Sequence, residues 1–304
     1  MLARPEAPEP EDAAVAQQVE LAPAKINLAL HVVGQREDGY HLLESIVAFA
    51  DIGDRLTFTA SGEDGLTFSG QFAAALASDP GDNLVAHARD RLRSVIQRLG
   101  GEAPAVSIHL EKNLPVASGI GGGSADAAAT LRGLLRFWRS QLSLGEVADL
   151  ALSLGADVPM CLHGDAALVT GIGEQLSPLP GFPSLFLVLG NPLRAVSTPA
   201  VFSRLASKQN PPILGITGDD WISHLSRLRN DLEKPAHALV PEILEISDLI
   251  SSQGAVLTRM SGSGATCFGI FPSREAADQA ADRLTALKPS WYFRSTTTTA
   301  GFSA

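Results

Sequence analysis

A run of glycines near the middle of the chain has the residue types that bind phosphate. Residues 119–124 are Gly-Ile-Gly-Gly-Gly-Ser, between an apolar strand pattern at 106–110 and a helical pattern that continues to Trp138. Glycine lets a backbone approach a ligand closely, and free amides at a helix N-terminus attract phosphate without basic side chains. The pattern predicts a phosphate-binding loop, which we extend to its neighbours: Pro115, Val116, Ala117, Ser118, Gly119, Ile120, Gly121, Gly122, Gly123, Ser124 and Ala125.

Two other glycine-rich motifs fit this loop less well. A Walker A loop ends in Gly-Lys-Ser or Gly-Lys-Thr, whereas this loop ends in Gly123, Ser124 and Ala125 and has no lysine. A dinucleotide-binding fingerprint requires Gly or Ala at position 124 and an acidic residue about 20 positions later, and the chain does not supply them. A glycine turn that serves chain geometry alone is the remaining alternative, although consecutive glycines are unfavourable unless something must come close.

Two charged residues and an amide could act beside such a loop. Apolar residues alternate from Ile26 to Val32, which predicts a half-buried strand with Lys25 and Asn27 on its less apolar face. Asp157 lies just beyond a short helix that begins near a Ser143 and Glu146 capping box and that Gly155 can end. Isolated Lys and Asp residues are most often solvated surface groups, so position alone does not establish a role for them.

Strand and helix patterns alternate irregularly along the chain. Strand patterns cover 55–59, 65–69, 106–110, 185–189, 266–271 and 291–295, and helical patterns cover 83–99, 222–228, 241–251 and 275–287. The apolar stretch 42–52 fits either a strand or a helix. Because the elements follow no regular repeat, we expect an α+β fold and not a doubly wound parallel sheet.

The length of 304 residues predicts two domains with a cleft between them. Proline and glycine cluster at 173–183, so we place the domains at 21–172 and 173–304, with a last strand that could return to the first domain. Residues 1–20 are rich in Ala, Pro and Glu and lack the apolar core of a secretory signal. We predict that they form a disordered tail.

Composition limits the classes of partner. The chain has 23 Lys and Arg against 33 Asp and Glu, a net charge of −10, which argues against nucleic-acid binding. No apolar run reaches the roughly 18 residues of a membrane span. Cys161 and Cys267 both lie in apolar runs, so we assign no disulfide. Cys161 and His163 are close in sequence but have no further ligands at the spacing of a zinc site, so we assign no metal site. We expect a cytoplasmic monomer or weak homodimer with a small-molecule substrate.

The long motif from Pro115 to Ala128 resembles the phosphate loop of the galactokinase, homoserine kinase and mevalonate kinase (GHMP kinase) superfamily. Two more segments are similar to that superfamily, Ala-Pro-Ala-Lys-Ile-Asn-Leu at 22–28 and Met-Ser-Gly-Ser-Gly-Ala-Thr at 260–266. They occur in the same order, so the resemblance covers nearly the whole chain from Leu21. It implies a two-domain α+β fold, with an N-terminal domain like ribosomal protein S5 domain 2 and a ferredoxin-like C-terminal domain.

Two further segments are similar to one family of the superfamily, the 4-diphosphocytidyl-2-C-methyl-D-erythritol kinases. They are Gly-Gln-Arg-Glu-Asp-Gly-Tyr-His at 34–41 and Leu-Gly-Ala-Asp-Val-Pro at 154–159. The resemblance implies transfer of the ATP γ-phosphate, with Mg²⁺, to the 2-hydroxyl of a cytidine-diphosphate-linked methylerythritol in the non-mevalonate isoprenoid pathway. A homoserine or mevalonate kinase, or a catalytically silent nucleotide or sugar sensor, is the alternative.

The same resemblance assigns catalytic roles. Asp157 matches the catalytic base, and Lys25 matches a lysine beside it that would keep the carboxylate ionised and favour the incipient alkoxide. Asn27 would orient the polyol of the substrate. Asp126, which we place in the first turn of the helix after the glycines, is expected to interact with the helix dipole.

The resemblance also implies a pocket for cytosine. Tyr40 and Phe202 would sandwich the base, His41 would bond its edge, and Thr198 would lie near the same pocket. One departure is Ala125, because many members have a second serine there. Since a backbone amide would still contact phosphate at that position, we expect only a modest effect on nucleotide binding.

Overall fold

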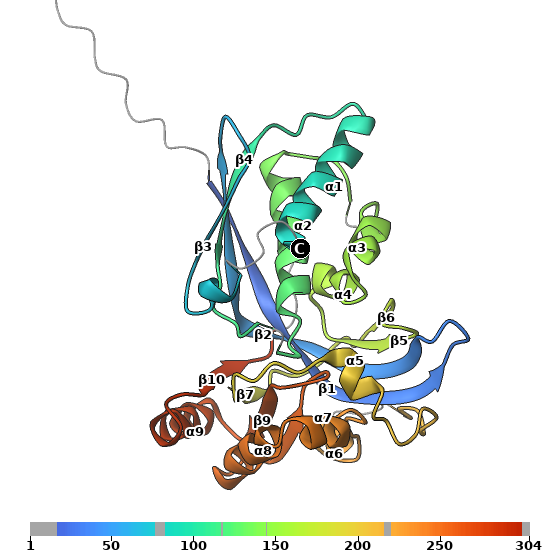
Figure 1. The fold of residues 1–304 in the computed structure, drawn as a ribbon, viewed down its shortest axis with the longest axis vertical. Helices are drawn as coiled ribbons and strands as arrows, with labels where there is room; N and C mark the ends of the chain where they lie inside the picture. Colours follow the sequence, from blue (N-terminus) through green and yellow to red (C-terminus); the bar gives the residue numbers. More distant parts are fainter. Residues whose placement is uncertain (1–16, 77–82, 117, 144, 216–219, 300–304) are drawn as a thin grey trace, which may run out of the picture.

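The structure, a computed structural model, describes residues 17–76, 83–116, 118–143, 145–215 and 220–299. Its strands form two sheets, and each sheet carries helices on one face (Figure 1). Between the sheets, apolar residues of β1 such as Ile26 and Leu28 share a buried cluster with Leu187 and Phe268 of the smaller sheet. The predicted α+β class is confirmed.

The larger sheet is built around two long antiparallel strands. Its strands are β1 (Gln17–Gln35), β2 (His41–Ala60), β3 (Gly65–Ser69), β4 (Val106–Glu111), β5 (Ala167–Thr170) and β6 (Gln175–Pro178). The order is β3-β4-β2-β5-β6, and β1 pairs with β2 along most of their length. The apolar stretch 42–52 is therefore part of a strand, continuous with the predicted strand 55–59.

Strand β1 begins earlier than the sequence indicated. Residues 17–20, which we assigned to a disordered tail, pair with β2, and Glu20 is buried. Its carboxylate accepts hydrogen bonds from Arg132 at 2.8 Å and Arg136 at 2.6 Å. The tail prediction is wrong for these four positions, because contacts with α2 stabilise a polar segment that has no apolar pattern of its own. Residues 1–16 lie outside the described residues.

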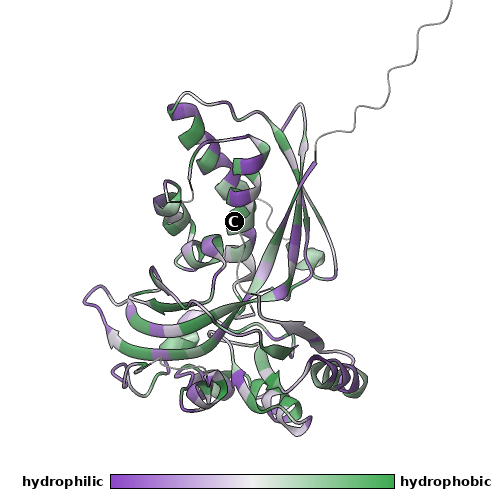
Figure 2. Ribbon diagram, turned by 180° about the vertical axis from the view of Figure 1, so that it is seen from behind, coloured by the Kyte–Doolittle hydropathy of each residue, from purple (hydrophilic) through white to green (hydrophobic). Residues whose placement is uncertain are grey.

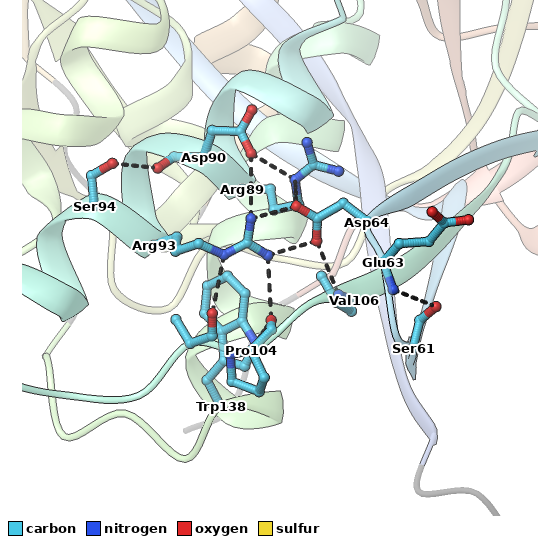
Figure 3. A network of polar contacts seen from close by, with 11 residues as sticks. Ser61, Glu63, Asp64, Arg89, Asp90, Arg93, Ser94, Pro104, Val106 and Trp138 are labelled. Atoms are coloured by element: carbon cyan, nitrogen blue, oxygen red, sulfur yellow. Dashed lines mark hydrogen bonds and ion pairs between the residues drawn. The ribbon is translucent and has the colours of Figure 1, made fainter.

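Four helices cover one face of the larger sheet (Figure 1). They are α1 (Leu84–Arg98), α2 (Gly122–Phe137), α3 (Ala148–Leu154) and α4 (Val158–His163), and a short 3-10 helix, η1, spans Ala73–Ala75. The side chain of Asn83 caps α1 by accepting from the Val85 amide. Further along, Arg93 of α1 binds Asp64 before β3 with both terminal nitrogens and lies over the Trp138 ring (Figure 3).

The smaller sheet is antiparallel in the order β10-β7-β9-β8. Its strands are β7 (Phe186–Asn191), β8 (Leu257–Met260), β9 (Cys267–Phe271) and β10 (Tyr292–Thr297), and its helices are α5 (Thr198–Phe202), α6 (Trp221–Ser226), α7 (Glu233–Leu239), α8 (Glu242–Ser252) and α9 (Arg274–Leu287). Alanines and Leu284 form the buried face of α9, and its other faces are largely hydrophilic (Figure 2). Among the described helices, none is long and apolar enough to span a bilayer.

The two sheets do not divide the chain at residue 173. Strand β6 extends the larger sheet to Pro178. Strand β10 pairs with β7 of the smaller sheet. The two residues that follow β10 contact β2 of the larger sheet: Thr298 forms a bridge with Ala50, and the backbone N–H of Thr299 donates to the Phe49 carbonyl. The end of the chain therefore contacts both sheets, and the exact domain division stays a prediction.

Candidate active site

Lys25 and Asp157, which are distant in sequence, form an ion pair. The Lys25 Nζ lies 2.8 Å from Asp157 Oδ2, and the side chains are 6% and 40% exposed. Lys25 projects from β1, whereas Asp157 lies between α3 and α4 at the N-cap position of α4, and its carboxylate makes no capping bond. The lysine is thus fixed inside the protein while its carboxylate partner is open to a ligand.

The glycine-rich loop covers this lysine. Gly119 and Gly121 have φ values of 74° and 71°, which favour glycine, and α2 begins at Gly122. The Lys25 amide donates to the Ile120 carbonyl at 3.0 Å, and a Cβ on Gly121 would lie 3.2 Å from the Lys25 Cβ. No larger residue fits between loop and lysine without displacement.

The first amides of α2 are available to a ligand. In an α-helix the first N–H groups have no intrahelical acceptor, which applies here to Gly122, Gly123 and Ser124. The Ala125 amide, in contrast, donates to the Gly121 carbonyl at 2.7 Å. Our expectation of a free amide at Ala125 is therefore wrong, because the helix has already used it. Ala117 lies outside the described residues.

A second glycine loop, residues 261–264, packs against the first one. A Cβ on Gly119 would lie 2.5 Å from the Ser261 carbonyl oxygen, and a Cβ on Gly262 would lie 2.7 Å from the Gly119 oxygen. The Ser261 hydroxyl donates to the Gly119 carbonyl and accepts from the Asn27 amide, each at 3.0 Å. We had recognised this segment as a family motif without giving it site residues.

Asn27 presents an unused acceptor beside the ion pair. Its Nδ2 donates to the Ser45 hydroxyl at 2.7 Å, and Ser45 donates to the Ala29 carbonyl at 2.6 Å. The Asn27 Oδ1 is buried and has no hydrogen-bond partner among the described residues. A buried polar atom without a partner is unfavourable unless a ligand or water satisfies it.

The aromatic residues lie differently from the predicted sandwich. The ring stacked on Phe202 is that of His41, with centroids 4.6 Å apart, whereas Tyr40 is 60% exposed. Burial, and then the charge of Lys208, lower the pKa of His41, so its ring is neutral near pH 7. Thr198 begins α5 and its hydroxyl lies 2.7 Å from that of Ser263. The roles of Tyr40, His41, Thr198 and Phe202 in binding cytosine stay predictions.

A cavity of about 370 Å³ brings most of these residues together. It is lined by residues of the ion pair, both glycine loops and α5, including Lys25, Asn27, Ser45, Gly121, Gly122, Gly123, Ser124, Asp157, Thr198, Phe202, Gly262 and Ser263. Ser118 and Gly119 also line it, whereas Tyr40 and His41 do not. Residues from both halves of the chain thus form one site.

A smaller cavity of about 170 Å³ adjoins the other side of the loop and is also lined by Gly122 and Gly123. Beside them Lys112 is buried and donates to Asp54 and Asp126, at 2.5 Å each. Burial raises the pKa of Asp126 to about 7 despite the opposing charge of Lys112. Asp126 is thus not in the first turn as predicted but pairs with Lys112, a lone lysine that carried no sequence signal.

Comparisons with known proteins agree with this architecture. The sequence matches the families described as GHMP kinases N terminal domain, over residues 83–165, and GHMP kinases C terminal, over residues 219–289. A homoserine kinase from Cytophaga hutchinsonii, at 17% identity, has a TM-score of 0.64 over 98% of both chains, which indicates a shared fold.

Several relatives are much more similar. A 4-diphosphocytidyl-2-C-methyl-D-erythritol kinase from Rhizobium etli is 55% identical over 282 residues, 93% of this chain and 95% of the relative. One from Agrobacterium fabrum is 54% identical over 288 residues, with 93% and 96% covered. The crystal structure of a 4-(cytidine 5'-diphospho)-2C-methyl-D-erythritol kinase is 33% identical, with a TM-score of 0.75 over 92% of this chain and 98% of that one. The chain therefore belongs to the GHMP kinases and, among them, to the 4-diphosphocytidyl-2-C-methyl-D-erythritol kinase family.

Proposed function

We propose that this protein phosphorylates the 2-hydroxyl of 4-diphosphocytidyl-2-C-methyl-D-erythritol with ATP, in the non-mevalonate route to isoprenoid precursors. One observation carries the proposal: the Lys25–Asp157 pair lines the same cavity as the free amides of Gly122, Gly123 and Ser124. Phosphoryl transfer requires mainly that an activated hydroxyl and a phosphate be held together and that their charge be neutralised.

In the proposed reaction the substrate hydroxyl attacks the γ-phosphorus of ATP. Asp157 accepts the proton of the hydroxyl, the new phosphorus–oxygen bond forms, and the bond from the γ-phosphorus to the bridging oxygen breaks to release ADP. Lys25, which forms an ion pair with Asp157, stabilises negative charge on the attacking oxygen. The buried Oδ1 of Asn27 accepts a hydrogen bond from another hydroxyl of the polyol, which satisfies the unpartnered atom.

For ATP, we propose that the phosphates lie on the amides that begin α2. Because Gly122 and Gly123 also border the smaller cavity, the nucleoside would extend there, against Asn83, Leu84 and Val116. This arrangement leaves the larger cavity for the acceptor. It accounts for triphosphate binding by an acidic chain, since backbone amides and the helix dipole replace basic side chains.

Magnesium would accompany the nucleotide. The oxygen donors that line the cavity include the Ser124 hydroxyl and the Asp157 carboxylate, whose Oδ2 already binds Lys25. Few protein oxygens suit Mg²⁺, which keeps several waters and binds largely through substrate phosphates. When bound, it would neutralise charge on the β- and γ-phosphates.

Cytidine recognition by Tyr40, His41 and Phe202 is the part of the proposal that most needs movement. In the structure the His41 ring covers one face of Phe202, so either ring must shift before a base can stack there. The buried Nε2 of His41, which has no partner in the part of the chain that the structure describes, then bonds the cytosine edge. A cytoplasmic enzyme that is a monomer or weak homodimer remains our expectation.

A turnover assay tests the proposed function directly. With ATP and Mg²⁺, we expect ADP release and a phosphorylated product with the diphosphocytidyl substrate, and much slower turnover with methylerythritol phosphate, which lacks the cytidylyl group. Homoserine and mevalonate serve as rival acceptors. Faster turnover of a rival would reassign the enzyme within the superfamily, and nucleotide binding without turnover of any acceptor would favour a sensor.

A further inference from the structure

The strand that carries Lys25 and Asn27 contains an irregularity beside the site. Asn27 pairs with Val47 of β2 and Ala29 pairs with Ile46, so Leu28 is one extra residue in β1. Such a β-bulge changes which side chains point to a given face. Accordingly Lys25 and Asn27 line the larger cavity, and the next residue of β1 to do so is Leu30 and not Ala29.

An arginine from the other half of the chain binds the carbonyl of the bulged residue. The Arg259 Nη1 donates to the Leu28 carbonyl at 2.5 Å, while its Nη2 donates to the carbonyls of Leu225 at 3.0 Å and Leu228 at 2.6 Å. Arg259 is 6% exposed, and no carboxylate of the described residues lies within ion-pair distance of it. Its buried guanidinium is committed to backbone carbonyls at the end of α6 and in β1.

The neighbouring serine completes the hold on β1. The Ser261 hydroxyl accepts from the backbone N–H of Asn27, so Ser261 and Arg259 bind the N–H of Asn27 and the carbonyl of Leu28 on either side of the peptide bond between them. Leu28 is fully buried, and without Arg259 its carbonyl would lack this donor. If the strand relaxed by one residue at the bulge, Asn27 would turn away from the cavity, because side chains alternate between the faces of a sheet. Lys25 is held separately, by the Ile120 carbonyl and Asp157.

We propose that Arg259 is a positioning residue for the kinase reaction: by holding the Leu28 bulge, it sets the direction in which Asn27 faces the substrate. This inference rests on the proposed function. It also explains the residue type, because only the planar fork of arginine can bind carbonyls on two separate elements with fixed geometry, whereas lysine offers a single flexible ammonium. Burial lowers the pKa of Arg259 to about 10, which leaves it charged at neutral pH.

A double-mutant cycle between Arg259→Lys and Asn27→Ala tests the proposal. If Arg259 acts through the bulge, Arg259→Lys should lower kcat about tenfold in the wild-type background, because a small displacement of reacting groups has large effects on rate. In the Asn27→Ala background the same change should lower kcat less than about twofold. The affinity for ATP, measured by calorimetry, should stay unchanged.

Arg93→Lys is the matched control. Arg93 also donates to backbone carbonyls, those of Ala103 and Pro104, but it projects from α1 and contacts neither β1 nor the cavity among the described residues. It should lower the melting temperature without changing kcat of the folded enzyme. The proposal is overturned if Arg259→Lys behaves like this control, or if its effect on kcat is equally large in both backgrounds. If instead Asn27→Ala itself has wild-type kcat, the proposed role of Asn27 fails.

Discussion

The exposures of Lys25 and Asp157 suit a catalytic base and the cation that pairs with it. The lysine is 6% exposed and is held by the loop above it, whereas the carboxylate is 40% exposed at the cavity. A base must reach the proton that it accepts, while its positive partner gains strength from burial, where water screens less. Burial of the ammonium and access to the carboxylate are therefore consistent with base catalysis by Asp157.

Asp157→Asn should remove turnover and keep nucleotide binding. An amide cannot accept the hydroxyl proton, so kcat should fall by more than about 100-fold. Because the proposed phosphate site consists of the first amides of α2 and not of Asp157, the dissociation constant for ATP should change less than about threefold. Steady-state rates and calorimetry measure the two quantities. Asp165→Asn, at an exposed position after α4, is the control, and a near-normal rate for Asp157→Asn would exclude the assigned base.

Tyr40→Ala should weaken binding of the acceptor substrate selectively. Tyr40 is 60% exposed, so its loss should not disturb the core. Loss of base stacking should raise the KM for the diphosphocytidyl substrate about tenfold and leave the KM for ATP unchanged. The substrate without the cytidylyl group is the internal control. Equal increases for both acceptors, or for ATP, would contradict the cytosine assignment.

At the scale of elements, the two glycine loops form one packed unit. Gly119→Ala would put a Cβ 2.5 Å from the Ser261 oxygen and 2.7 Å from the Gly264 oxygen, at a φ of 74°. The loops would have to separate, and the amides that begin α2 would lose their alignment. We expect the dissociation constant for ATP to rise at least about tenfold, together with a lower melting temperature.

Gly145→Ala is the matched control for this change. Its added Cβ would meet only the Ser143 hydroxyl, at 3.8 Å, which is an ordinary contact. ATP affinity should therefore stay at the wild-type value. Wild-type affinity in Gly119→Ala as well would show that the close packing of the loops does not matter for the nucleotide.

An ion pair between Arg93 and Asp64, which depends on pH, joins helix α1 to the larger sheet. The hydrogen bonds from Arg93 lower the pKa of Asp64 against the effect of its partial burial, and the Val106 amide adds to the shift (Figure 3). Because the folded-state pKa is below the unfolded value, this contribution is present above about pH 4 and is lost as the pH falls through the folded pKa.

Asp64→Asn should lower the free energy of unfolding at pH 7 and flatten its dependence on pH below about 4. The loss should be on the order of 1 kcal/mol, because the carboxylate is partly exposed at 28% and water screens the pair. Urea unfolding at pH 7 and pH 3 measures both effects. Asp90→Asn, at a carboxylate that is 55% exposed, should change little. If the free energy of unfolding depends on pH in the same way in Asp64→Asn as in the wild type, Asp64 is not the origin of that dependence.

At the scale of the whole molecule, the site lies where the two halves of the chain meet. The free edge of β1 bonds in turn to the first glycine loop, to Arg259 and Ser261, and to the backbone of residues 229–231. Strand β1 is thus held by β2 on one side and by the C-terminal half on the other. Contacts from both halves of the chain therefore position Lys25 and Asn27.

Local patterns were sufficient for many elements of the fold. The pattern at 83–99 predicts a helix, and the structure has α1 at Leu84–Arg98. The long strand β2 was the hardest element, because its apolar residues support either form until pairing with β1, β4 and β5 decides. Short elements such as α5, α7 and β6 carry too few residues for a periodic signal.

The amino-acid sequence by itself determined the phosphate loop, the family and the residue types of the ion pair, because a motif is a property of neighbouring residues. Only the tertiary structure decided the packing of the two glycine loops, the partners of Lys112, the Leu28 bulge and its contact with Arg259. These contacts join residues far apart in the chain, such as Leu28 and Arg259, 231 positions apart. No local pattern encodes them, since they depend on which surfaces meet when both sheets pack.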